Sequence, residues 1–100
     1  MTEATPAITH QPDTHRFEMQ LEGHTAYAEY TLRPGVFVFA HTIVPKQLGG
    51  RGLGSQLAKH GLDYAAAQNL KVDPQCSFVK TYIDRHPEYQ ANSLAHDAKP

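Results

Sequence analysis

The sequence predicts a mixed α/β fold in which antiparallel N-terminal strands lead into a helix that follows a glycine-rich loop, then a further strand and a short C-terminal helix. In the first half of the chain, apolar residues alternate with polar ones, as in strands with one buried face. After about residue 50, apolar residues recur at helical spacing. A chain of 100 residues buries enough surface for one sheet with a helix or two, so we expect a single domain.

Composition excludes several classes of protein. The chain has 9 Lys and Arg against 10 Asp and Glu, whereas nucleic-acid binding requires a basic excess, so no nucleic-acid partner is expected. A single cysteine cannot form an internal disulfide. The longest apolar run, residues 36–40, is far shorter than a membrane span, and residues 1–14 lack the pattern of a signal peptide. We therefore expect a soluble cytoplasmic protein with no membrane partner.

The two ends of the chain differ in composition from its middle. Residues 1–15 are rich in Thr, Pro and His without periodicity, and residues 91–100 are similar. We predict flexible tails at 1–15 and 91–100 around a domain at 16–90.

Three strands are predicted before the glycine-rich loop. Residues 16–21 and 25–33 alternate in polarity, and the Gly23 turn joins them. Residues 36–44 are more continuously apolar and follow the turn at Pro34-Gly35, which predicts the central, most buried strand.

The second half of the chain reads as helix, strand and helix. A stripe of small and apolar residues predicts a helix over 55–68 that ends at Asn69. Residues 70–73 then form a strand that a crossover returns to the sheet. Ser77 is placed to cap a short helix that ends near His86. The stripe consists of Gly54, Leu57, Ala58, Gly61, Leu62 and Ala65.

The glycine-rich segment 49–54 between a strand and a helix is typical of an anion site. Glycines let backbone N–H groups converge on phosphate oxygens, and the helix N-terminus adds partial positive charge. The segment is neither a Walker loop, because Lys59 lies well inside the helix, nor a G-x-G-x-x-G dinucleotide fingerprint. Glycines that only turn the chain are an equally good interpretation of the loop alone.

The context of the loop resembles that of a known family. His41-Thr42-Ile43-Val44-Pro45, followed by Gly49-Gly50-Arg51-Gly52-Leu53-Gly54-Ser55-Gln56-Leu57, resembles the acetyl-CoA loop of the GNAT superfamily of N-acetyltransferases, [RQ]-x-x-G-x-[GA]. With Gly52 and Gly54 as the paired glycines, Gly49 replaces the leading Arg or Gln. The alternative register, Gln47-x-x-Gly50-x-Gly52, places the glycines too early for the helix.

Downstream motifs extend the resemblance to residues 17–89. Lys71-Val72-Asp73-Pro74-Gln75-Cys76-Ser77-Phe78-Val79 and Tyr82-Ile83-Asp84-Arg85-His86-Pro87-Glu88-Tyr89 are similar to the minimal GNAT-like family of YidJ-like acetyltransferases. Several motifs in the same order are more specific than a glycine loop.

The resemblance implies how acetyl-CoA would lie. Pantetheine would pair with the backbone around Ile43 and Val44, and Arg51 would bring charge to the phosphates. The family lacks the two helices that wall the acceptor site in larger GNAT enzymes, so the acceptor side is expected to be open. This suits an amine on a macromolecule, such as a protein, or a site that another subunit completes. The pyrophosphate would lie on the amides of Gly50, Arg51, Gly52, Leu53, Gly54 and Ser55.

Three side chains are candidate catalytic groups. Cys76 precedes a predicted helix N-terminus, which favours the thiolate. It would accept the acetyl group or return a proton to CoA. The alternative interpretation is that Cys76 is a small buried core residue without a chemical role. His41 would be the general base, or a histidine bonded within the sheet. Tyr82 would be the general acid, although its helical spacing with Phe78 favours core packing.

The remaining histidines show no metal-ligand spacing, so no metal is expected. Two functions remain open: an acetyl-CoA-dependent N-acetyltransferase, and a non-catalytic acyl-CoA-binding or protein-interaction module that keeps the loop.

Overall fold

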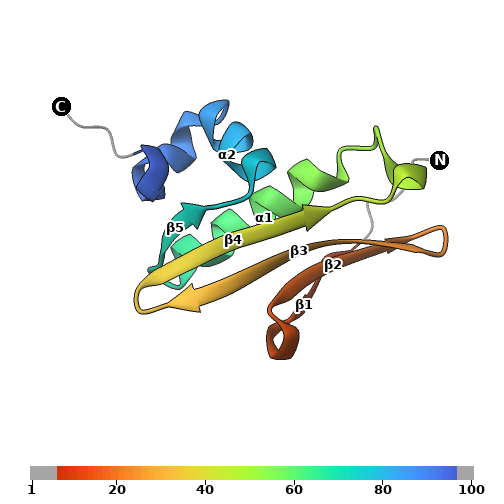
Figure 1. The fold of residues 1–100 in the computed structure, drawn as a ribbon, viewed down its shortest axis with the longest axis horizontal. Helices are drawn as coiled ribbons and strands as arrows, with labels where there is room; N and C mark the ends of the chain where they lie inside the picture. The colour runs from red at the N-terminus through yellow and green to blue at the C-terminus, as the bar shows by residue number, and fades with distance from the viewer. Residues whose placement is uncertain (1–6, 97–100) are drawn as a thin grey trace.

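The computed structural model describes residues 7–96 and contains a five-stranded mixed sheet with two α-helices (Figure 1). The strands lie in the order β1-β2-β3-β4-β5, antiparallel except for the parallel pair β4–β5. The strands are β1 (Thr9–Gln11), β2 (Arg16–Leu21), β3 (His24–Arg33), β4 (Val36–Ile43) and β5 (Lys71–Pro74). The α-helices are α1 (Leu53–Ala67) and α2 (Ser77–Asp84), and short 3-10 turns are η1 (Pro12–Thr14), η2 (Lys46–Leu48), η3 (Pro87–Asn92) and η4 (Leu94–His96). The mixed α/β prediction is confirmed.

The helices cover one face of the sheet. In Figure 1, α1 lies behind the sheet, and no helix of the described residues crosses the front of β2, β3 and β4. Helix α1 contacts β2, β3, β4 and β5, and α2 contacts α1, β4 and β5. We call the uncovered side the open face. No helix in the described part of the chain is long and apolar enough to cross a membrane.

The core lies between the sheet and the helices. The whole predicted stripe of α1 is buried, and it packs on the aromatic side chains of β2, β3 and β4. Gly61 permits the closest approach, because a Cβ there would lie 2.3 Å from Cζ of the buried Phe39. The core consists of Phe17, Met19, Ala26, Ala28, Tyr30, Phe37, Phe39, Leu48, Leu53, Leu57, Ala58, Leu62, Ala65, Val72, Val79 and Ile83.

A β-bulge interrupts β4. Tyr30 pairs with Phe39 and Glu29 pairs with His41, so Ala40 is an extra residue on β4. The extra residue reverses the alternation of the strand. Beyond it, Thr42 pairs with the buried Ala28 and faces the helices, whereas His41 is exposed on the open face.

Both ends of the chain contain more structure than predicted. Strand β1 and turn η1 lie within the segment predicted as a tail, and the His10 ring stacks on Phe17 at 4.4 Å between ring centroids. Near the other end, the Asn92 amide donates to the Leu70 carbonyl at 2.7 Å, and Ser93 is buried. These segments are too short to show a periodic pattern of apolar residues in the sequence, so their secondary structure depends on tertiary contacts. The remainder of the predicted tails, 1–6 and 97–100, lies outside the described residues.

Helix boundaries differ slightly from the prediction. Helix α1 begins two residues early, at Leu53, because Gly52 adopts φ 76° and serves as its N-cap. Cys76 rather than Ser77 is the N-cap residue of α2. Asn69, with φ 61°, follows α1 as predicted.

Candidate functional site

Strands β4 and β5 separate at the centre of the candidate site. Their pairing ends where Phe39 lies beside Pro74, and the amides of Gln75 and Cys76 then both donate to the Phe39 carbonyl, at 3.0 and 3.1 Å. Strand β4 continues to Ile43, while the chain after β5 turns into α2. Within the described residues, the end of β4 therefore has no strand beside it on the β5 side.

A pocket of about 480 Å3 opens at this separation. Its walls come from the end of β4, the β4–α1 connection, the first turn of α1, and one ring from α2. The volume lies in the usual range for ligand pockets, about 300–1,000 Å3. The lining residues are Thr42, Val44, Pro45, Lys46, Leu48, Gly49, Gly50, Gly52, Leu53, Gly54, Ser55 and Phe78.

The start of α1 presents backbone donors to this pocket. Gly50 and Gly52 have φ 80° and 76°, a conformation open mainly to glycine, so the loop can turn its amides inward. No side chain caps α1, and its first turn contains no acidic residue. The amides at the start of the helix and its dipole therefore favour an anion at this place.

Of the eight residues predicted to bind the ligand, all but Ile43 and Arg51 line the pocket. The Ile43 side chain is 44% exposed and pairs with Tyr27, which places it on the open face. The Arg51 guanidinium donates to both carboxylate oxygens of Glu22, at 2.9 and 3.1 Å. The charge of Arg51 is thus engaged with the β2–β3 hairpin.

Cys76 adjoins the pocket without lining it. Its half-buried thiol donates a weak hydrogen bond to Oγ1 of Thr42, with the two atoms 3.6 Å apart. Thr42 lines the pocket, so the Cys76 sulfur contacts a residue of the pocket wall.

His41 lies on the other side of the sheet. It is exposed and pairs across the strands with Glu29, whose carboxylate accepts from Arg16 at 3.2 Å. The bulge therefore places His41 and the pocket-lining Thr42 on opposite faces of β4.

Tyr82 lines a second hollow, of about 110 Å3, that shares Ser55 and Phe78 with the main pocket. Its ring stacks on His86 with centroids 3.9 Å apart. Burial raises the pKa of the Tyr82 phenol, so this side chain keeps its proton at neutral pH.

Sequence reasoning missed several lining residues. Helical spacing placed Phe78 on one face with Tyr82 and did not mark it as a pocket residue, yet it is 43% exposed and its ring covers Gly54. Thr42 was missed because a bulge leaves no signature in a short apolar strand. Lys46 and Leu48 lie in η2, a turn that the prediction left without structure.

Comparison with known proteins extends over most of the chain. A family model described as GCN5-related N-acetyl-transferase matches residues 16–92. The chain is 36% identical over 47 residues to Protein NATD1 of chicken, Gallus gallus, which is 47% of this chain and 43% of that protein. The same match to the human protein covers 42% of it, so the chain matches less than half of these relatives. The zebrafish protein, from Danio rerio, is 27% identical over 88 residues, 82% of this chain and 79% of its own.

A solved structure is also similar. The solution structure of a GCN5-like candidate N-acetyltransferase from Staphylococcus aureus matches with a TM-score of 0.72 and 27% identity. The match covers 92% of this chain and 91% of that protein.

Proposed function

The chain belongs to the GCN5-related N-acetyltransferases, and we propose that it transfers the acetyl group of acetyl-CoA to an amine, on a protein or another macromolecule. The observation that carries the proposal is the pocket itself, which joins an uncapped helix N-terminus and a glycine loop to the free end of a strand. The helix N-terminus and the glycine loop suit an anionic pyrophosphate. The end of strand β4 suits an extended chain that bears amide groups, such as pantetheine. The narrower YidJ-like assignment stays a prediction.

The residues of the pocket fit the parts of acetyl-CoA. Pyrophosphate oxygens would accept from the amides between Gly50 and Ser55, and Lys46 at the rim would add positive charge. The pantetheine chain would run along the end of β4, where apolar walls from Leu48, Leu53 and Phe78 exclude water.

When bound, acetyl-CoA would supply a thioester carbonyl that an uncharged amine attacks, with a new C–N bond formed and CoA released as a thiol. The Val44 amide, at the free end of β4, would stabilise negative charge on the carbonyl oxygen. His41, which lies on the open face and is not among the pocket residues, would take the proton of an amine that reaches the thioester from that face. Tyr82 or Cys76 would give a proton to the departing sulfur; burial raises the pKa of the Tyr82 phenol, so this group carries its proton at neutral pH.

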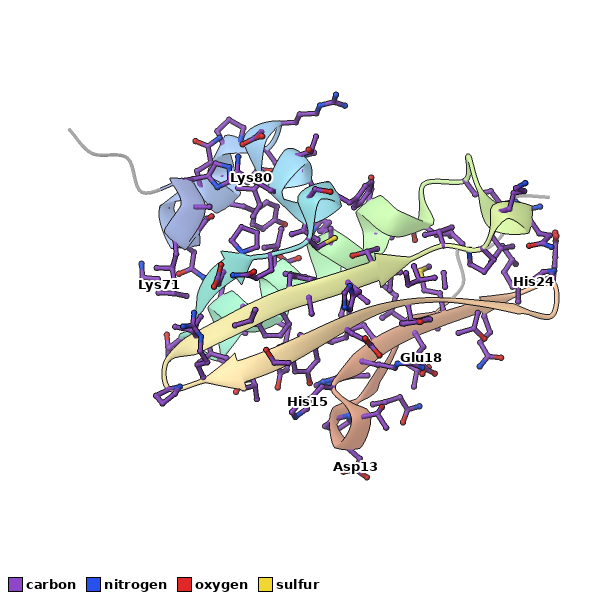
Figure 2. All side chains as sticks on the ribbon, in the orientation of Figure 1. Asp13, His15, Glu18, His24, Lys71 and Lys80 are labelled. Atoms are coloured by element: carbon purple, nitrogen blue, oxygen red, sulfur yellow. The ribbon has the colours of Figure 1, made fainter. Side chains whose placement is uncertain are left out.

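The open face supports a large acceptor. Among residues 7–96, no helix crosses the front of β2, β3 and β4 (Figure 1), so an amine that projects from a macromolecule would meet no helix of this part of the chain on that side. Figure 2 shows the Glu18 side chain on β2 of this sheet. The chemistry of the open face is mixed, because Arg16 lies between Glu18 and Glu29, at 3.5 and 3.1 Å.

A titration with acetyl-CoA followed by amide NMR tests the ligand. We expect shifts at Ile43, Val44 and the amides from Gly50 to Ser55. Shifts confined to β2 and β3 would contradict the proposal.

Acetyl transfer to a broad panel of amines and peptides, followed by mass spectrometry, tests the reaction. Transfer of one acetyl group to any amine supports the enzyme. Tight acetyl-CoA binding without transfer would instead favour a binding module.

A further inference from the structure

The tip of the β2–β3 hairpin is joined to the glycine loop of the pocket. Arg51 donates from both terminal nitrogens to the two carboxylate oxygens of Glu22, at 2.9 and 3.1 Å, across 29 positions of sequence. In Figure 1 the hairpin tip and the β4–α1 connection lie at the same end of the molecule, and His24, labelled in Figure 2, marks that tip. A bidentate pair fixes both distance and orientation, which a single contact does not.

Glu22 occupies a backbone conformation that does not suit it. Its φ is 54° and that of Gly23 is 77°, as a two-residue hairpin turn of mirror-image type requires at both positions. Asn, Asp and Gly are the residues that normally fill the first position, because a longer side chain is disfavoured at positive φ. A glutamate with φ 54° at this position is therefore a backbone outlier, which is a reason to seek a purpose of its side chain outside the turn.

The Glu22 side chain contacts the glycine loop at Arg51. Four of the six residues in 49–54 are glycine, so an unanchored loop would sample many conformations in which its amides do not converge. Arg51 lies between Gly50 and Gly52, which both line the pocket. Holding Arg51 therefore restricts both neighbours at once. The Arg51 guanidinium also lowers the pKa of the Glu22 carboxyl, so the pair stays charged at neutral pH.

We propose that Glu22 is a positioning residue for acetyl-CoA binding: it holds Arg51 against the hairpin and so keeps the glycine loop in the shape that receives the pyrophosphate. The inference rests on the proposed function. It assigns anion recognition to the loop amides and gives Arg51 a structural task, in place of the direct phosphate contact that the sequence predicted.

The decisive variant is Glu22→Asn, because it suits the turn better while it removes the ion pair. We expect an unchanged or higher Tm together with an acetyl-CoA Kd weakened by about two- to fivefold, the range for a well-ordered exposed pair. In turnover assays KM for acetyl-CoA should rise by the same factor with kcat unchanged. Glu22→Gln keeps side-chain length and backbone strain but removes the charge, and it should weaken binding similarly.

Two controls separate the pair from general effects. Arg33→Gln breaks the exposed pair with Asp73, whose Oδ2 lies 3.0 Å from Nη2 of Arg33 beside the β3–β4 turn, and should leave Kd unchanged. The double variant Glu22→Asn/Arg51→Gln should bind no more weakly than Arg51→Gln alone, since the Glu22 substitution acts on the loop through Arg51.

Three results would overturn the inference. Wild-type affinity in Glu22→Asn would show that the loop does not need Glu22 to keep its shape, while the proposed function would stand. Tighter binding would show that Arg51, once released, contacts the phosphates itself. Failure of the wild-type protein to bind acetyl-CoA would overturn this inference and the proposed function together.

Discussion

The sulfur of Cys76 lies 3.6 Å from Oγ1 of Thr42, although the two residues are 34 positions apart. This contact bridges the gap where β4 and β5 separate and links the start of α2 to the pocket wall. It depends on the bulge at Ala40, because without the extra residue His41, and not Thr42, would face the helices. One irregularity therefore sets which side chains face the two sides of the site.

The variant Gly52→Asp should abolish acetyl-CoA binding while the chain stays folded. Gly52 has φ 76° and lines the pocket at the N-cap of α1, so a carboxylate there would repel the pyrophosphate. Calorimetric titration with acetyl-CoA measures the effect. Gly35→Asp is the matched control, since Gly35 has φ 74° in the β3–β4 turn and is not among the pocket residues. Both variants should lose about 1–2 kcal/mol of stability to backbone strain. Equal binding by the two would contradict an anion site at the loop.

The variant Gly61→Ala should destabilise the protein, although alanine is the better helix former. A Cβ at this position would lie 2.3 Å from Cζ of Phe39, which is fully buried. We expect overpacking to cost about 1–3 kcal/mol, which offsets the gain of about 1 kcal/mol in helix propensity and leaves a net loss of up to about 2 kcal/mol in the free energy of unfolding.

Urea denaturation measures this change. Gly61→Ala should lower the free energy of unfolding less in a Phe39→Leu background than in the wild-type background, because the smaller leucine side chain leaves room for the new methyl group. A more stable Gly61→Ala protein would mean that the Phe39 ring moves at little cost.

The elements with a periodic pattern of apolar residues could be predicted from the sequence. Strand alternation and the α1 stripe are periodic, and all six stripe residues are buried as predicted. The parallel return of β5 followed from its place after a helix. The bulge at Ala40 could not be predicted, because a single inserted residue changes no composition and no turn signal. Strand β1 depends on contacts of His10 with Phe17 and Tyr30, which local patterns do not contain.

The part of the candidate site that consists of backbone groups could be located from the sequence. The glycine loop and helix start were placed by spacing, and six of the eight predicted ligand residues line the pocket. Side-chain roles were harder to predict, because they depend on which residue happens to face which neighbour. Glu22 lies far along the sequence, so nothing local could indicate that it takes up the charge of Arg51.

Stability should fall as the pH is lowered through the ordinary range of histidine, with His10 as a contributor. Burial, followed by the nearby charges of His60 and His15, lowers the pKa of His10 from its usual 6.5. Below the unfolded value, the unfolded chain takes up this proton before the folded chain does, so the folded state loses stability as pH falls.

Chemical denaturation between about pH 7 and pH 5 measures this slope. His10→Phe keeps a ring to stack on Phe17 but cannot titrate, so its stability should fall less over this range. The variant also loses the 2.5 Å contact with the Tyr30 hydroxyl, and that lowers its stability at all pH values without adding to the slope below neutrality. Equal slopes in the two proteins would contradict a role for His10.

The role of Cys76 can be decided by combining alkylation, mass measurement and substitution. Bound acetyl-CoA should slow alkylation, because Thr42, which contacts the sulfur, lines the pocket. If Cys76 carried the acetyl group, incubation without an amine would leave one acetyl on the thiol and Cys76→Ala would stop turnover. We expect direct attack instead, since the Cys76 sulfur contacts Thr42 but Cys76 is not among the residues that line the pocket. No adduct should then form, and Cys76→Ser should remain active.

Tyr82→Phe or His41→Ala should lower the turnover rate more than Cys76→Ser does, by about 100-fold if either residue transfers a proton. A thiol that neither reacts nor is protected by acetyl-CoA would refute both roles and leave Cys76 as the N-cap residue of α2.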